Sequence, residues 1–314
     1  MQGLLDAIIS FSNWIWGIPM LVIIVGGSIY LTIKLGFMQF RYFGYAMSQT
    51  FGKIFAKKDK AVEGEGTLSA WQAASAALAS GIGASNIVGV PVAVAFGGPG
   101  AIFWMWVVAL VGSGAKVAEI ALGVKYRELN EEGEYVGGPM YYLPKGIKGP
   151  LGKILGISFS FFLMIELVPS IATQAVSVVQ TATTMGIPNW ASGLVLMILV
   201  GAVVFGGIKR IGRTTEKIVP FMAILYVIGA IVIIFVNIGE LPRVFGLIFK
   251  HAFTPMAAVG GFTGSTIATA MRWGTARGVY SNESGMGTAP IAHATAVTDH
   301  PIRQSLWGIF ENVV

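Results

Sequence analysis

The sequence predicts an all-α integral membrane protein, and three observations carry this prediction. Of the 314 residues, 54% are hydrophobic and only 11% are charged, whereas roughly a quarter of a typical soluble domain is charged. The mean hydropathy is +0.72, and several apolar runs reach the length of about 20 residues that a helix needs to cross the hydrocarbon layer. These runs are continuous rather than alternating, which favours helices over a β-barrel.

The first half of the chain is expected to contain three spans. The first, 14–35, begins with Trp14, an aromatic residue of the kind that anchors a helix at the membrane interface. The second, 68–96, is apolar but is interrupted by glycine near its middle. A Gly-Gly-Pro-Gly turn then leads into the third span, 101–123.

The second half of the chain is expected to contain four more spans and part of another. The fourth and fifth, 153–181 and 190–207, are long apolar runs, and the sixth, 216–238, is another with a proline near its start. The seventh begins near Met256 and is rich in glycine and polar residues, and an eighth begins near Ser305.

The basic residues predict the orientation of these spans. Lysines and arginines gather in the loops after the first, third and fifth spans and are absent from the turns after the second and fourth. Because basic loops stay in the cytoplasm, the sequence predicts a multi-pass protein of the cell membrane with its N-terminus outside. The net charge of +6 is then explained by loops beside the lipid bilayer, and no nucleic-acid partner is expected.

Catalytic and transition-metal chemistry is not expected. The chain has no cysteine, and its three histidines are scattered. It contains no P-loop, no HExxH motif and no arrangement typical of a serine or metal hydrolase. The sequence therefore predicts a protein that is not an enzyme and has no cofactor.

The stretch LASGIGASNIVG (78–89) places three glycines inside the second span, beside Ser85 and Asn86. Each glycine costs up to about 1 kcal/mol relative to alanine in a helix. Unwound backbone within the membrane is tolerated only where it lines a cavity or packs against protein. Close helix packing through small residues is the alternative explanation, but the polar side chains at the same depth favour an interrupted helix.

A second stretch of the same character, RWGTARGVYSNESGMGTAP (272–290), lies in the seventh span and places Asn282 and Glu283 among four glycines. Paired interrupted helices in corresponding halves of a chain indicate a transporter site at the membrane midplane. The freed N–H groups suit a carboxylate, and the freed carbonyls suit a cation such as Na⁺.

Five charged residues lie in or near the spans, and three of them have two interpretations each. Glu283 and Arg277 are either functional or a structural pair near one end of the seventh span. Lys116 and Glu119, three residues apart, are expected to form a pair within one helix. Glu166 either faces the cavity, where it meets a substrate amine or carries a proton, or lies at the outer interface.

Four segments resemble the alanine or glycine:cation symporter family, which includes sodium/alanine symporters and belongs to the amino acid-polyamine-organocation superfamily. They are GGPGAIFWMWVVAL (97–110), GGPMYYLPKG (137–146), GGIKRIGRTTEKIVPFMAILY (206–226) and RGVYSNESGMGTAPIAHATA (277–296).

The resemblance implies a leucine-transporter-like inverted-repeat fold with one extra N-terminal helix. The extra helix would be 14–35, the first five-helix repeat 68–238, and the incomplete start of the second repeat 256–314, with the C-terminal helices missing from this chain. It also implies Na⁺-coupled uptake of a small neutral amino acid such as alanine or glycine by alternating access, with H⁺ as the second possible coupling ion.

The resemblance also implies which residues bind. It places the substrate site at Gly81, Ala84, Ser85, Asn86, Gln174 and Tyr280, and the argument from interrupted helices adds Gly83, Asn282 and Glu283. Asn86 would bind a cation or hold the loop, and backbone carbonyls of Ala79 and Ile82 would face the other cation site.

Three departures from the family pattern bear on the substrate. The usual Gly-Thr-Gly-Asn is here Gly83-Ala84-Ser85-Asn86, Val176 replaces a frequent asparagine, and Glu166 is additional. These changes alter the size and polarity of the expected pocket. Two alternatives to a symporter stay open, an amino-acid-binding membrane sensor and an uncoupled channel, and the oligomeric state is not predicted.

Overall fold

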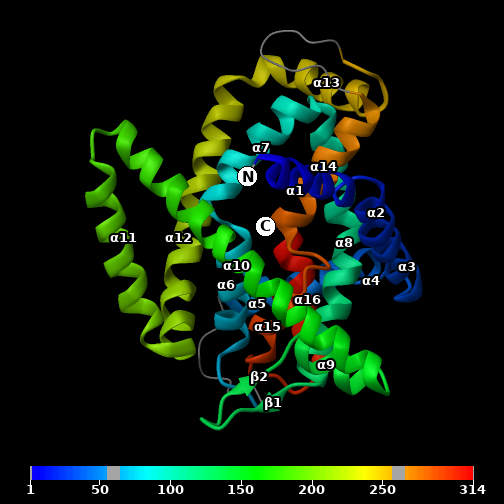
Figure 1. Ribbon diagram of the computed structural model, residues 1–314, viewed down its shortest axis with the longest axis vertical. Coiled ribbons are helices and arrows are strands. Elements are labelled where there is room, and N and C mark those ends of the chain that lie inside the picture. Colours follow the sequence, from blue (N-terminus) through cyan, green and yellow to red (C-terminus); the bar gives the residue numbers. More distant parts are fainter. Residues whose placement is uncertain (1, 55–63, 257–265, 314) are drawn as a thin grey trace.

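The computed structural model describes residues 2–54, 64–256 and 266–313, which are mostly helical (Figure 1). The first helices are α1 (Gln2–Ile15), α2 (Ile18–Met20), the π-helical segment η1 (Leu21–Gly26), α3 (Gly27–Lys34), α4 (Met38–Arg41), α5 (Phe43–Ile54), α6 (Ala70–Gly81), α7 (Ala84–Gly97) and α8 (Gly100–Lys125). The antiparallel strands β1 (Glu128–Leu129) and β2 (Tyr135–Val136) follow. The remaining helices are α9 (Pro139–Gly146), α10 (Pro150–Thr184), α11 (Asn189–Val204), α12 (Gly207–Val236), the 3₁₀ turn η2 (Ile238–Glu240), α13 (Leu241–Phe253), α14 (Ile267–Asn282), α15 (Ala289–Ala294) and α16 (Pro301–Val313).

Three of the described helices are long and apolar enough to cross a membrane: α8, α10 and α12. They coincide with the third, fourth and sixth expected spans. The helices α6 and α7 add a fourth if they are taken as one span bent by 42°. The fifth expected span corresponds to α11, which is apolar but has only 16 residues. A helix of this length rises only about 24 Å.

The predicted start of the first span is wrong. Trp14 belongs to α1, which ends at Ile15, and the chain turns before it resumes as α2. Gly17 lies in this turn, and Pro19 follows it. Because proline has no N–H to continue the hydrogen-bond ladder, the two stretches form separate helices rather than one span.

The seventh expected span is described only from Thr266 onward, and 257–265 lie outside the described residues. The hydroxyl of Thr266 caps α14 by accepting a hydrogen bond from the backbone N–H of Thr269 at 3.1 Å. The preceding helix α13 was not expected, because its 13 residues carry Arg243 and Lys250 and do not form a long apolar run.

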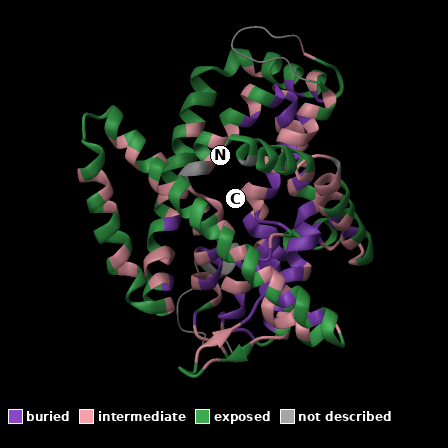
Figure 2. Ribbon diagram, in the orientation of Figure 1, coloured by how far each residue is buried: buried purple, intermediate pink, exposed green. Residues whose placement is uncertain are grey.

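The helix α8 lies at the centre of the described structure. In its most apolar stretch 61% of the residues are buried, against 6% in α10 and in α12. It packs against α3, α13, α14, α15 and α16. Figure 2 shows the buried residues gathered around α8 and α16, while α11 and α12 are exposed along most of their length. The exposed side chains of α10 to α12 are largely apolar, which is compatible with a membrane protein.

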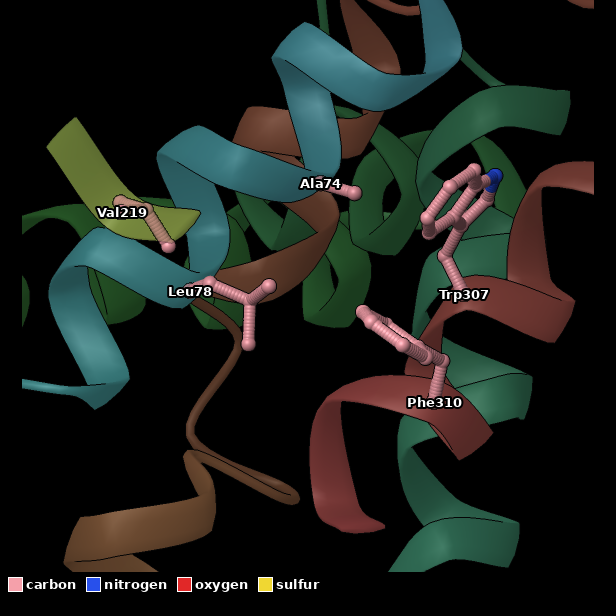
Figure 3. Close-up of a cluster of buried hydrophobic side chains, with 5 residues drawn as sticks. All are labelled: Ala74, Leu78, Val219, Trp307 and Phe310. Carbon is pink, nitrogen blue, oxygen red and sulfur yellow. The ribbon is translucent and has the colours of Figure 1, made fainter. Parts of the chain in front are cut away.

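A cluster of buried apolar side chains fixes the position of α6 (Figure 3). Ala74 and Leu78 on α6 lie against Val219 on α12 and against Trp307 and Phe310 on α16. The rings of Trp307 and Phe310 meet edge to face with their centroids 5.6 Å apart. Because α6 is held on two sides, the backbone that follows it has a fixed starting point.

Candidate functional site

The first expected interruption is present between α6 and α7. Helix α6 ends at Gly81, and Ile82 and Gly83 leave helical geometry with ψ angles of 60° and 164°. Gly83, the N-cap residue of α7, has no side chain that could cap the helix. The first N–H groups of α7 therefore keep the partial positive charge of a helix N-terminus.

The glycine at the interruption allows close approach of α10. A Cβ atom built on Gly83 would lie 2.7 Å from the Cδ and Oε1 atoms of Gln174. Real Cβ atoms essentially never come this close to another heavy atom. The contact places the Gln174 amide directly against the interrupted backbone, as expected for a residue that closes the site.

We expect Gly83→Ala to lower the free energy of unfolding by up to about 1 kcal/mol, because the added methyl group must displace the amide at the flexible end of the Gln174 side chain. The measurement is thermal unfolding in detergent, and Gly83→Ala combined with Gln174→Ala should recover most of the loss. The matched control is Gly193→Ala in α11, where a Cβ atom meets nothing within 4 Å. Equal effects of the two glycine substitutions would show that the contact with Gln174 is absent.

The second expected interruption follows α14. Glu283 adopts the left-handed conformation with φ of 52°, and Gly285 and Gly287 have φ of 80° and 78°. The helix resumes only at Ala289 in α15. Glycine accepts positive φ at no steric cost, so the last two glycines of the motif permit this loop.

The two interruptions lie against each other. The Ser80 hydroxyl donates to Glu283 Oε1 at 2.5 Å. Asn86 donates through its side-chain amide to the carbonyl of Gly81 and accepts from the Arg277 guanidinium and, at 3.3 Å, from the Ser281 hydroxyl. Side chains and backbone from both interrupted helices therefore meet in one cluster of oxygen atoms.

Two residues of α8 hold the ends of the second interruption, and the predicted pair between them is wrong. The Lys116 ammonium donates to the carbonyl of Asn282 at 2.8 Å, at the end of α14. The Glu119 carboxylate accepts from the backbone N–H groups of Gly285 and Gly287 at 3.2 and 3.1 Å. The Lys116 ammonium thus meets a backbone carbonyl, and the Glu119 carboxylate meets backbone N–H groups. These contacts to the second interruption take the place of the expected pair between the two side chains.

The alternative of a pair between Arg277 and Glu283 is also not observed. Arg277 bonds Asn86 and lies over the ring of Tyr280, with 5.1 Å from its Cζ atom to the ring centroid. Glu283 accepts from Ser80 and, at 2.7 Å, from the Thr288 hydroxyl. The two charges are therefore bound separately, one at each interruption.

The remaining expected residues fall around the same cluster. The Tyr280 hydroxyl shares a hydrogen bond of 3.0 Å with the Ser170 hydroxyl of α10. Ala79 lies in the last turn of α6, and Ile82 lies in the interruption itself. Ala84 and Ser85 begin α7 in the backbone, but their side chains lie outside the described residues. The expected ligand groups that are described are bonded largely to one another in this structure.

A buried polar network on α16 was not anticipated from the sequence. Glu311 lies 3.0 Å from the Lys116 ammonium and 2.7 Å from His293 Nε2, and Gln304 lies 2.8 Å from His293 Nδ1. All four side chains are buried. Spacing along the sequence does not indicate this network, because its pairing joins segments almost 200 residues apart.

Comparison with known proteins decides the family. The sequence model of one protein family, described as the sodium:alanine symporter family, matches residues 1–314. The chain belongs to the sodium:alanine symporter family. The resemblance stated from the sequence is thereby confirmed, as is the prediction that the protein is not an enzyme, because the family is one of transporters.

Three relatives show how far this family membership extends along the chain. An uncharacterized transporter of Bacillus subtilis, YflA, is 50% identical over 100% of this chain. The sodium/alanine symporter AgcS of Methanococcus maripaludis is 46% identical over 94%, and the probable sodium/glutamine symporter GlnT of Bacillus subtilis is 37% identical over 98%. The chain spans 65%, 64% and 62% of the lengths of these relatives, respectively.

Proposed function

We propose that the protein acts in the cell membrane as a secondary symporter that couples Na⁺ entry to the uptake of a small neutral amino acid. The single observation that carries this proposal is the meeting of two interrupted helices, α6/α7 and α14/α15, through oxygen atoms and non-helical backbone. Interrupted helices of this kind form the substrate and ion sites of secondary transporters. The names of the relatives AgcS and GlnT, a sodium/alanine and a probable sodium/glutamine symporter, support Na⁺ and an amino acid as the cargo.

The cation site is proposed at Asn86. Its side-chain oxygen, the Ser281 hydroxyl and the carbonyl of Gly81 lie together, and oxygen atoms of this kind are the ligands that unwound helices offer to Na⁺. The positively charged Arg277 guanidinium contacts the same Asn86 oxygen. We place a coupling ion at Asn86, where it replaces the Arg277 contact. The carbonyls of Ala79 and Ile82 are proposed to face the other cation site, and H⁺ is the second possible coupling ion.

The substrate site is proposed at the start of α7. The first N–H groups of α7, which receive no cap from the side chain of their N-cap residue, suit the carboxylate of an amino acid. Gln174 closes on Gly83, and Tyr280 is tied to α10 through Ser170. A site closed this tightly by Gln174 and Tyr280 suits a substrate with a small side chain, which favours alanine and then glycine. Asn282 and Glu283 contribute less directly, because Lys116, Ser80 and Thr288 already bind them.

The order of helices supports an inverted-repeat, leucine-transporter-like arrangement. An interrupted helix pair, α6 and α7, is followed by the central helix α8. A second interrupted pair, α14 and α15, is followed by α16, which packs against α8. We infer that each pair opens one repeat, with the extra helix formed by α2 to α3 and the basic loops on the cytoplasmic side.

The test is Asn86→Ala in the full-length protein. We expect Na⁺-dependent binding of alanine, measured by isothermal titration in detergent, to weaken at least tenfold, because the change removes an oxygen at the proposed cation site. The matched control is Asn237→Ala at the end of α12, whose side chain bonds only its own helix among the described residues. Unchanged binding by the Asn86 variant would refute this placement of the site.

Uptake into proteoliposomes separates the symporter from the two alternatives. A symporter accumulates labelled alanine against its gradient when Na⁺ is higher outside, and it saturates. Binding without accumulation would indicate a sensor, and flux without accumulation a channel.

A further inference from the structure

The first turns of α12 carry a stripe of basic side chains that the proposed transport site does not use. A hollow of about 620 Å³ is lined by Gly206, Lys209, Arg210, Arg213, Thr214, Lys217 and Ile218. The spacing of three and four residues places these positions on one face of the helix. No acidic side chain lines the hollow, so four positive charges surround one volume.

Two of these cations have no fixed partner in the described part of the chain. Lys209 lies 3.6 Å from Glu134, and Arg210 donates to the carbonyl of Ala202 at 2.9 Å. Arg213 and Lys217 are exposed, and neither forms an ion pair with a described residue. Like charges one turn apart repel each other, so the face is complementary to an anion.

The same face continues as an exposed apolar stripe. Phe221, Leu225, Ile228 and Val232 follow Lys217 at intervals of three and four residues and are each more than half exposed. From Lys217 to Val232 the helix rises about 22 Å, which exceeds half of the roughly 30 Å hydrocarbon layer. One face of α12 therefore has a basic end, which suits the headgroup of an anionic phospholipid, followed by an apolar stripe, which suits its acyl chains.

We propose that this face of α12 binds an anionic phospholipid, with the headgroup phosphate in the hollow between Arg213 and Lys217 and an acyl chain along the stripe from Phe221 to Val232. Arginine and lysine are the side chains that bind phosphate, and basic pockets beside membrane helices bind anionic headgroups. The site is separate from the proposed transport site and does not depend on it.

The experiment compares short-chain lipids of the same tail length in binding to the detergent-purified full-length protein. Dioctanoyl-phosphatidylglycerol is expected to bind and to raise the unfolding temperature, whereas dioctanoyl-phosphatidylcholine raises it much less. The double variant Arg213→Gln/Lys217→Gln should weaken phosphatidylglycerol binding about tenfold. The variant Arg213→Lys/Lys217→Arg keeps the charge and should keep the binding, which shows that the loss reflects charge and not misfolding.

Two further arms complete the test. The control Lys148→Gln/Lys250→Gln removes the same number of charges from exposed sites elsewhere and should change phosphatidylglycerol binding less than twofold. Inorganic phosphate alone should stabilise the protein far less than the lipid. The proposal is overturned if the control loses as much binding as the double variant, if phosphatidylcholine binds equally, or if inorganic phosphate matches the lipid.

Discussion

Lys116→Met is expected to lower the free energy of unfolding by about 3–5 kcal/mol, the range for removing one partner of a buried ion pair. The Lys116 ammonium lies 3.0 Å from Glu311, and the two side chains are only 6% and 1% exposed. Without the lysine, the Glu311 carboxylate stays in a water-poor interior with His293 as its remaining described partner. The carbonyl of Asn282 also loses its donor.

Thermal and denaturant unfolding in detergent measure this effect. The matched control is Lys145→Met, because Lys145 and Glu128 form an ion pair of 2.6 Å with side chains 35% and 49% exposed. Such exposed pairs contribute about 0–1 kcal/mol. The double variant Lys116→Met/Glu311→Leu should recover much of the loss, since no charge is then stranded. A Lys116 variant no less stable than the control would contradict the buried pair.

The same residues explain why the second interruption has a defined shape. Lys116 neutralises the end of α14, where carbonyls accumulate negative partial charge, and Glu119 binds the N–H groups of Gly285 and Gly287. At the second interruption, Lys116 and Glu119 of α8 thus bind the backbone groups that a cation and a substrate carboxylate were expected to bind. Consequently the first interruption, where the N-cap residue Gly83 has no side chain to offer the helix start, is the better candidate for the carboxylate.

The sequence predicted those features that depend on local composition. The apolar runs located α8, α10 and α12, and glycines beside polar residues located both interruptions, because these signals lie within a few neighbouring positions. The family resemblance, not spacing, indicated Gln174 as a site residue, but its contact with Gly83 was not predicted. The break near Gly17 was missed because the hydrophobic composition continues across it.

The polar contacts were not predictable because they join distant segments. Lys116 and Glu119 are three residues apart, which favoured a pair between them, yet their partners lie more than 160 residues away. Ser80 and Glu283 are separated by 203 residues. Spacing identifies neighbours on one helix, but it does not identify which other helix supplies a better partner.

Arg127→Gln is expected to open one end of the molecule. The Arg127 guanidinium donates to the carbonyls of Ala294 and Ala296 at 3.1 and 2.7 Å and to that of Glu65 at 2.6 Å. It therefore joins the segment before α6 to the segment after α15, where Leu68 and Ala296 also form a backbone bridge. Partial burial lowers the pKa of Arg127, but a guanidinium stays charged at neutral pH. The interrupted helices separate at this end only if these bonds break.

Hydrogen–deuterium exchange measures this opening directly. Peptides covering 64–69 and 294–298 should exchange about 30- to 100-fold faster in the Arg127 variant, which corresponds to a loss of about 2–3 kcal/mol from charge-assisted hydrogen bonds. Peptides from the middle of α8 should keep their protection, because that helix is buried independently of Arg127. The matched control is Arg303→Gln, whose exposed pair with Asp299 lies at 2.5 Å near the same end. If both variants exchange alike, Arg127 does not hold the two segments together, and backbone bridges such as that between Leu68 and Ala296 are sufficient by themselves.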